Sequence, residues 1–354
     1  MENNYCVIMA GGVGARFWPM STKKEPKQFH DFLGTGMTLL QQTYQRMKKL
    51  APAENIYFVI NEMYKDIVLK QIPETTVDNL IMEPAAMNTA PCIAYASYKI
   101  HAKNPKANLF IAPSDHLIVF EDEFVRIAKI AMKAAEEGDK LITLGIQPNR
   151  PETGFGYIQY VSSEDSVKKV KQFAEKPELK KAEQFLRSGD YLWNSGMFIW
   201  KTQSIINAFE RYTPEYHKVF STDVYFTPEE EKYIQEVYPQ LTKDSIDYAI
   251  MEKSDNVYVI PSSFGWSDLG AWTAIYDQLE KDDNENAIQG KVLTYNTQES
   301  LIIGQKEKIT IIDGLQDYFV VDTDNVLIIC KKENAQEVKE YVKDVQANFG
   351  NDFV

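Results

Sequence analysis

The sequence predicts an α/β protein in which a mostly parallel sheet is followed by a small all-β unit and a terminal helix. Three observations predict it. Residues 5–144 alternate short apolar runs with longer segments of helical spacing, which is typical of strand–helix–strand units with right-handed crossovers. Beyond residue 285 the apolar runs become short and are separated by turn residues. Residues 335–345 then carry apolar side chains at helical spacing.

The elements of the first part follow from apolar runs and from spacing. The predicted strands are Tyr5–Ala10, Asn55–Ile60, Leu80–Met82, Leu109–Ala112, Leu141–Leu144, Tyr157–Tyr160, Lys168–Ala174 and Leu192–Trp200. The predicted helices are Thr38–Leu50, Ala90–Ala102, Glu123–Glu137 and Leu179–Arg187. Ligands bind beyond the carboxyl ends of parallel strands. We therefore expect the polar residues after Ala10, Met82 and Ala112 to be site candidates.

The second part is predicted from short β-type runs with turns between them. These runs are Lys291–Asn296, Ser300–Ile303, Lys308–Ile312, Tyr318–Val321 and Val326–Cys330. Asn334 is the expected cap of the final helix. A chain of 354 residues accommodates about two or three domains. Because residues 277–286 are polar and charge-rich, we expect one domain over 1–284 and a second over 285–354.

Charge and composition exclude several classes of protein. The chain has 51 acidic and 38 basic residues, a net charge of −13, which disfavours binding of nucleic acid. Its three cysteines are too few and too scattered for a disulfide framework or a zinc site. No apolar run reaches the ~18 residues of a membrane span, and the N-terminus lacks the positive region of a signal peptide. We expect a cytoplasmic protein without a membrane contact.

The strongest local signal directly follows the first predicted strand. Gly11, Gly12 and Gly14 let the backbone approach a ligand closely, with N–H groups that can bind an anion. Arg16 and Lys27 add positive charge in the same block, and residues 11–30 hold four basic residues against one acidic residue, a local balance of +3. This block suits the binding of a triphosphate. The alternative, non-functional interpretation is a glycine turn with surface lysines.

Two common phosphate loops do not fit this block. A Walker loop requires Gly-Lys-Ser/Thr, which is absent. In a dinucleotide fingerprint that starts at Gly12, the third glycine would stand where Phe17 is. The second predicted strand is moreover followed by Asn61 where that fingerprint has an acidic residue.

Six ordered segments resemble the sugar-1-phosphate nucleotidylyltransferases, and among them the guanylyltransferases that act on mannose 1-phosphate. The segments are Gly11–Pro19 with Pro26–Phe29, Glu83–Pro91, Pro113–His116, Phe173–Pro177, Trp193–Phe198 and Trp266–Gly270. The resemblance implies a Rossmann-like sheet of the nucleotide-diphospho-sugar transferase type. It also implies a short left-handed β-helix at the C-terminus, which helps such enzymes to form homodimers. The apolar runs of that unit need a partner surface, either the first domain or a second subunit.

The resemblance implies that GTP and mannose 1-phosphate form GDP-mannose and pyrophosphate, with Mg²⁺ as cofactor and without a covalent intermediate. Catalytic roles then fall to Arg16, Lys27 and Lys176. Nucleotide-binding positions are Gly11, Gly12, Gly14, Glu83, Asn88, Thr89 and Asp115. The sugar phosphate is held by Gly156, Glu175, Lys176 and Asn194. The metal is held by Asp115 and Asp268, in agreement with the preference of Mg²⁺ for one or two carboxylates.

One position departs from the family pattern. Met87 stands where relatives carry Arg or Lys before the Asn-Thr-Ala-Pro run, so the details of base binding stay open. Two other functions also stay open at this point. One is the same reaction with UTP or dTTP and glucose 1-phosphate, and the other is a non-catalytic sugar-nucleotide sensor on the same fold. We expect the tyrosines and phenylalanines to be core residues, and no cupin-type isomerase domain.

Overall fold

The computed structural model describes residues 2–354, which form two compact units. The first unit contains the residues up to Gly11 together with 43–114 and 118–266. The second contains 12–42, 115–117 and 267–354. The glycine loop thus belongs to the same unit as the C-terminal residues, although most of the chain lies between them.

The first unit is built on a nine-stranded sheet of order β3-β2-β1-β4-β9-β6-β10-β8-β7. Its strands are β1 (Asn4–Met9), β2 (Ile56–Asn61), β3 (Leu80–Glu83), β4 (Asn108–Pro113), β6 (Leu141–Ile146), β7 (Tyr157–Tyr160), β8 (Lys168–Ala174), β9 (Tyr191–Lys201) and β10 (Val257–Ser262). Two short strands, β5 (Leu117–Ile118) and β11 (Trp266–Ser267), pair with each other.

The expected parallel arrangement of the first strands is confirmed. β1 pairs in parallel with β2 and β4, β2 with β3, and β6 with β10. β9 runs antiparallel between β4 and β6, so these two neighbours point the same way. β8 is likewise antiparallel to both β10 and β7. As a result, the carboxyl ends of β1, β3 and β4 lie at one edge of the sheet.

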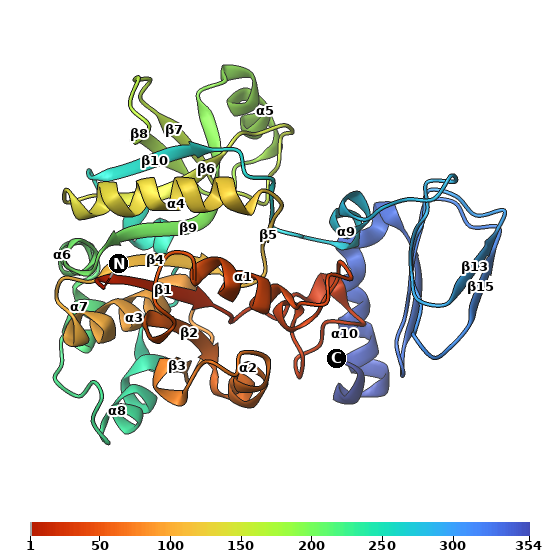
Figure 1. Ribbon diagram of the computed structural model, residues 1–354, viewed down its shortest axis with the longest axis horizontal. Helices are drawn as coiled ribbons and strands as arrows, with labels where there is room; N and C mark the ends of the chain where they lie inside the picture. Colours follow the sequence, from red (N-terminus) through yellow and green to blue (C-terminus); the bar gives the residue numbers. More distant parts are fainter. Residues whose placement is uncertain (1) are drawn as a thin grey trace. The chain divides into compact units, whose positions relative to one another are not determined.

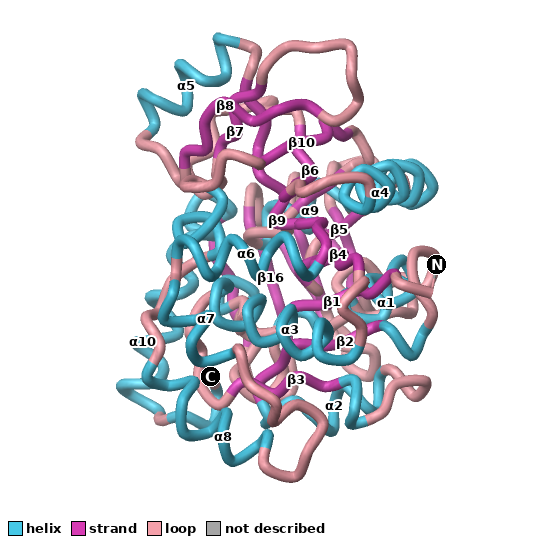
Figure 2. The backbone as a smooth tube through the Cα atoms, turned by 90° about the vertical axis from the view of Figure 1, so that its left-hand side faces the viewer, coloured by secondary structure: helices cyan, strands magenta, loops and turns pink. Residues whose placement is uncertain are grey.

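Helices cover both faces of this sheet (Figure 2). They are α2 (Lys65–Gln71), α3 (Thr89–Lys103), α4 (Glu121–Glu136), α5 (Leu179–Ser188), α6 (Thr202–Tyr212), α7 (Pro214–Phe220), α8 (Glu230–Val237), and α1 (Leu39–Met47), which begins in the second unit. Residues 247–251 form one turn of π-helix. The segments that form α2, α6, α7 and α8 were not predicted to be helical.

The alternation of side chains along β1 explains the two layers. Tyr5 and Val7 belong to a core cluster with buried residues of α3 and α6. Cys6 points to the other face, where its thiol approaches the backbone oxygen of Met47 in α1. Because both faces are covered, β1 is apolar at successive positions, as is typical of parallel strands.

The second unit contains the small all-β structure expected at the C-terminus. Its strands are β12 (Ala287–Gln289), β13 (Val292–Tyr295), β14 (Leu301–Ile303), β15 (Thr310–Asp313), β16 (Tyr318–Asp322) and β17 (Leu327–Lys331). β12, β14 and β16 stack in parallel, as do β13 and β15 beside them (Figure 1). Since no helix connects these parallel strands, the chain coils through successive rungs, which is a β-helix-like arrangement.

An aromatic cluster joins the glycine loop to the C-terminal residues of the same unit. Phe17 contacts the rings of Phe32 and Trp272, with centroids 4.9 and 5.2 Å away. Trp272 opens α9 (Trp272–Gln278) and stacks on Phe319 of β16. Val338, the first residue of α10 (Val338–Phe349), is fully buried in the same cluster.

The final helix corrects one expectation. Asn334 does not cap it, because residues Lys332–Glu337 form a 3-10 helix and α10 begins only at Val338. The burial of Ala335 and Val338 against the aromatic cluster sets this start. Over residues 2–354, no helix has the length and apolarity needed to cross a membrane.

Candidate functional site

The glycine loop and the Pro26–Phe29 segment fold against each other. The backbone N–H of Lys27 donates to the oxygen of Val13, at 3.1 Å. Gly14 has φ +72°, and a Cβ built there would lie 2.5 Å from the Cβ of Lys27. A side chain at position 14 would therefore meet both steric and backbone strain. The glycine is what allows Lys27 to approach the loop.

Lys27 is the centre of this part of the site. The residue is only 4% exposed. Its Nζ donates to Oδ2 of Asp115 at 3.0 Å and to the backbone oxygen of Asp268 at 2.7 Å, and it lies over the ring of Phe17. Burial by itself would raise the pKa of Asp115, but Lys27 and His116 outweigh it, so the pKa lies below its ordinary value. Asp115 is thus held as a carboxylate.

A cavity of about 350 Å³ lies beside this ion pair, entirely within the second unit. The residues that line it are Gly14, Ala15, Arg16, Phe17, Lys27, Asp115, His116, Asp268, Leu269, Gly270 and Lys339. The structure thus brings together all the second-unit residues predicted for phosphate and metal binding except Gly12. Lys339 was not predicted, since it stands at an exposed position of the terminal helix.

Asp115 and Asp268 are the carboxylates of this cavity. They offer hard oxygen ligands of the kind that Mg²⁺ takes while keeping several waters and substrate phosphates. Within residues 2–354, no group of three or more His, Cys, Asp or Glu side chains has a metal-holding arrangement. Asp115 and Asp268 therefore suit an ion that takes two ligands from the protein and the others from water or substrate. They do not suit an ion whose ligands all come from protein side chains.

In the first unit, Glu83 lies buried at the end of β3. Tyr238 donates its hydroxyl hydrogen to Oε1 of Glu83. A Cβ built on Gly11 would lie 3.6 Å from Oε2, so the backbone of the first glycine passes close to this carboxyl. Burial raises the pKa of Glu83 to about 7, against the opposing effect of the Tyr238 hydrogen bond. Tyr238 is a core residue, as expected of the tyrosines, and it also binds the carboxyl of a candidate site residue.

Asn88 and Thr89 form the start of α3. Asn88 has φ 69°, and its Oδ1 accepts a hydrogen bond from the backbone of Thr89. The Oγ1 of Thr89 accepts from the backbone N–H of Ile246 at 2.9 Å. Met87, the departure from the family pattern, is partly buried and packs against the main core cluster. An apolar side chain at position 87 is therefore compatible with this fold.

A second group of predicted residues gathers around Asn194. Its Nδ2 donates to Oδ1 of Asp247 at 2.9 Å, and its Oδ1 accepts from the hydroxyl of Thr143 at 3.1 Å. Glu175 pairs with Lys176, and a Cβ on Gly156 would collide with Oε2 of Glu175. The backbone at position 156 therefore passes close to the end of the Glu175 side chain, which a larger residue would have to displace.

Asp247 is a candidate site residue that the sequence did not indicate. Burial and the neighbouring Glu175 raise its pKa to about 7, although Lys176 acts in the opposite direction. The segment 244–247 also connects the two predicted groups of the first unit, because Ile246 bonds Thr89 while Asp247 bonds Asn194. Nothing in the sequence signals this connection, since it depends on a contact between distant segments.

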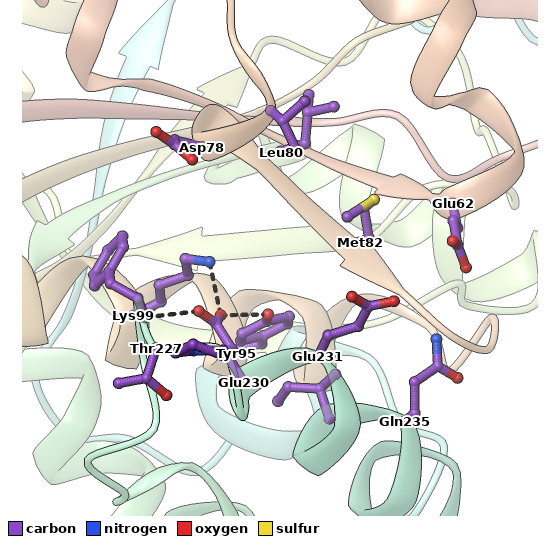
Figure 3. Close-up of a pocket in the computed structure, with 14 residues that line it drawn as sticks. Glu62, Asp78, Leu80, Met82, Tyr95, Lys99, Thr227, Glu230, Glu231 and Gln235 are labelled. Atoms are coloured by element: carbon purple, nitrogen blue, oxygen red, sulfur yellow. Dashed lines mark hydrogen bonds and ion pairs between the residues drawn. The ribbon is translucent and has the colours of Figure 1, made fainter.

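A larger cavity of about 480 Å³ contains none of the predicted residues (Figure 3). At its wall, Oε1 of Glu230 accepts hydrogen bonds from Lys99 and Tyr95, at 2.7 and 2.6 Å. Oε2 of Glu230 accepts from the backbone of Phe226 at 2.8 Å. Because this buried carboxylate is fully hydrogen-bonded, its role is to fasten α8 to α3.

Comparison with known proteins places these geometries in context. The family described as "Nucleotidyl transferase" matches residues 5–285, and "MannoseP isomerase/GMP-like beta-helix domain" matches residues 290–345. The chain is 34% identical over 356 residues to mannose-1-phosphate guanylyltransferase RfbM of Salmonella typhimurium, covering 98% of this chain and 73% of that protein. It is 33% identical over 356 residues to mannose-1-phosphate guanylyltransferase of Escherichia coli K12, covering 97% and 74%.

Among solved structures, one from Thermus thermophilus is similar over nearly the whole length. That protein is described as a mannose-1-phosphate geranyltransferase. The superposition gives a TM-score of 0.88 at 29% identity and covers 97% of this chain and 99% of the other. The similarity therefore includes the β-helix-like strands as well as the large sheet.

Proposed function

Because this chain belongs to the nucleotidyl transferase family, we propose that it transfers GMP from GTP to mannose 1-phosphate, giving GDP-mannose and pyrophosphate. It is a nucleotidyltransferase with the activity of a mannose-1-phosphate guanylyltransferase. The observation that carries the proposal is the ion pair of Lys27 and Asp115 in a cavity that also holds Arg16 and Asp268.

The reaction is an in-line displacement at the α-phosphorus of GTP. A phosphate oxygen of mannose 1-phosphate forms the new bond to phosphorus, and the bond to the oxygen that bridges to the β-phosphorus breaks. The electron pair leaves on pyrophosphate, and no covalent enzyme intermediate forms. Because the attacking phosphate is already an anion, the protein needs no general base. Its task is to bring two polyanions together, by positioning and by electrostatic stabilisation.

Arg16 and Lys27 are the residues we assign to the triphosphate and to the leaving pyrophosphate. Arg16 is exposed and lines the cavity, and Lys27 is fixed there by its two oxygen partners. The backbone N–H groups of Gly11, Gly12 and Gly14 add an anion-binding loop. A preorganised cation stabilises developing charge without reorganising when the reaction occurs.

Nucleotidyl transferases of this family generally use a divalent metal, and we assign Mg²⁺ to Asp115 and Asp268. The lowered pKa of Asp115 keeps that ligand charged. When bound there, Mg²⁺ would draw negative charge from the α-phosphate. Two carboxylates in one cavity support this assignment.

Glu83, Asn88 and Thr89 are the residues we assign to the nucleotide in the first unit. Guanine donates through N1–H and its exocyclic amine, so a carboxyl acceptor suits it. Oε1 of Glu83 is taken by Tyr238, while Oε2 lies beside the glycine at position 11.

Gly156, Glu175, Lys176 and Asn194 are assigned to mannose 1-phosphate. Lys176 carries the charge for the sugar phosphate, and pairing with Glu175 raises its pKa despite the opposing effect of burial. Carboxyl and amide groups suit vicinal hydroxyls, since they accept and donate hydrogen bonds. Asn194 bonds Asp247, and the charges of Glu175 and Lys176 act on the same carboxyl, which supports one sugar site.

A substrate screen tests the proposed function. The purified protein is incubated with each of four nucleoside triphosphates, each of several sugar 1-phosphates and Mg²⁺, and pyrophosphate release and product mass are measured. We expect turnover with GTP and mannose 1-phosphate. Preference for UTP or dTTP with glucose 1-phosphate would overturn the substrate assignment. If substrates bind but no pair of triphosphate and sugar 1-phosphate releases pyrophosphate, the assignment as an enzyme is overturned.

We also propose that the protein is a cytoplasmic homodimer with domains over 1–284 and 285–354. Leu293 and Ile311 are register partners on β13 and β15, and they are 52% and 63% exposed. Two exposed apolar side chains side by side support a second subunit as a partner surface. The three cysteines are free and buried, which is compatible with a reducing compartment.

A further inference from the structure

We propose that Lys339, on the C-terminal helix, is a third phosphate-binding cation and holds the triphosphate of the nucleotide together with Arg16 and Lys27. This inference rests on the proposed function. It extends that function by assigning part of the substrate site to the last helix of the chain, more than 300 positions after the glycine loop.

The lining of the 350 Å³ cavity supports this role. Lys339 lines it beside Arg16, Lys27, Asp115 and Asp268. Without Lys339, the Lys, Arg and Asp side chains of the lining are two cations and two carboxylates, so their charges sum to zero. With Lys339 the balance is +1. A cavity that has to accept a triphosphate gains from this extra charge, because the two carboxylates oppose the anion.

The three cations differ in what they already bind. The ammonium of Lys27 is taken up by Asp115 and by the backbone oxygen of Asp268. Arg16 and Lys339 are exposed, and within residues 2–354 neither forms an ion pair with a carboxylate. Two cations that face one cavity repel each other mildly. An anion bound between them offsets this repulsion.

The helix that carries Lys339 is fixed to the glycine loop at both ends (Figure 1). At its start, Val338 is fully buried in the cluster that contains Phe17. Beyond its end, the backbone oxygen of Phe353 accepts a hydrogen bond from the indole of Trp18 at 2.7 Å. Lys339 directly follows the buried Val338, so its backbone position is defined by packing and its side chain is free to reach the ligand.

Steady-state kinetics of Lys339→Ala test the proposal. We expect the KM for GTP to rise about tenfold, the scale of one charge-assisted hydrogen bond. The kcat and the KM for mannose 1-phosphate stay near wild type, and Lys339→Arg restores most of the GTP affinity. Because position 339 is exposed, the unfolding temperature should not change. Lys343→Ala is the matched control, since Lys343 lies on the same helix, pairs with Glu340 and does not line the cavity.

Calorimetric titration with inorganic tripolyphosphate separates this inference from the proposed function. We expect Lys339→Ala to bind tripolyphosphate about tenfold more weakly than wild type, and Lys343→Ala to match wild type. Unchanged GTP and tripolyphosphate affinities in Lys339→Ala, or equal losses in both variants, would overturn the role of Lys339. A third outcome separates the two claims. If the wild-type protein forms no GDP-mannose, and Lys339→Ala still binds tripolyphosphate more weakly than wild type, the proposed function is overturned and the phosphate site is retained.

Discussion

The ammonium nitrogen of Lys27 lies 3.0 Å from Oδ2 of Asp115, a residue 88 positions away in the sequence. The pair joins the glycine-loop segment to the residue that follows β4. Lys27 is almost completely buried, whereas the side chain of Asp115 keeps 34% of its surface exposed toward solvent. One end of the pair is therefore fixed in the fold, and the other is available to a ligand.

Lys27→Ala should reduce kcat by on the order of 10²-fold, the scale seen when one preorganised electrostatic group is removed. The substitution also leaves Asp115 without its main partner, so the unfolding temperature is measured alongside. Lys24→Ala is the control, because Lys24 is an exposed lysine of the same segment. Near-normal turnover in a folded Lys27→Ala protein would contradict the assigned mechanism.

Asp268→Asn should raise the Mg²⁺ concentration needed for half-maximal activity by at least about tenfold, because it removes one of two charged oxygen ligands. A Mg²⁺ titration at fixed substrate concentrations measures this. The control is Asp277→Asn, which changes an exposed aspartate outside the cavity. If the two variants had the same Mg²⁺ requirement as wild type, Asp268 would not be a metal ligand.

Asn194→Ala should raise the KM for mannose 1-phosphate about tenfold and leave the KM for GTP unchanged. The variant loses a donor and an acceptor next to Asp247, a loss on the scale of one or two hydrogen bonds. Initial rates over a grid of both substrates check the prediction. Asn207→Ala, at an exposed position, serves as the control. A rise in the KM for GTP alone would mean that Asn194 binds the nucleotide and not the sugar phosphate.

The unfolding free energy of Glu83→Gln should rise relative to that of the wild-type protein as the pH increases from 5 to 8. The pKa of the Glu83 carboxyl is about 7 in the folded chain and 4.5 in the unfolded one. The folded state therefore binds more protons between these values, and wild-type stability falls as pH rises through that window. At ~1.4 kcal/mol for each pKa unit, the difference in unfolding free energy grows by on the order of 2 kcal/mol and then levels off.

Urea unfolding of both proteins across this pH range measures that difference. Glu62→Gln is the control, because Glu62 is exposed and its substitution should give a flat difference. A flat difference for Glu83→Gln as well would mean that Glu83 is already charged at pH 5.

Ile311→Glu should convert the proposed homodimer into a monomer without lowering the unfolding temperature of the chain. Ile311 is largely exposed, so a charge there is tolerated in the free subunit and costly only when a partner covers it. Light scattering after size-exclusion chromatography gives the mass. Gln316→Glu adds the same charge at an exposed loop position and should leave the dimer intact. A wild-type monomer would refute the dimer outright.

The fold class could be predicted from the amino-acid sequence alone, and so could the glycine loop as a candidate site. Every strand of the large sheet except β10 was predicted, and the central ones, such as β1 and β4, were predicted from apolar runs because a strand covered on both faces is apolar along its length. Gly14 and Lys27 were predicted as site candidates because glycine and positive charge lie close together in the chain, and the structure brings them into contact. The segments that became α6, α7 and α8 were not predicted as helices, since their helical faces bury against α3 and against one another.

The tertiary structure decided which of these residues meet. Tyr238 reaches Glu83, Asp247 reaches Asn194, and Lys339 reaches the cavity of Lys27. Each partner is distant in sequence, and a lone Tyr, Asp or Lys has the same local pattern whether it faces solvent or a site. Local spacing reports only which side of a helix or strand is apolar. Which side chains meet depends on the order of the strands in the sheet and on the packing of the chain ends. Both are set only when the whole chain folds.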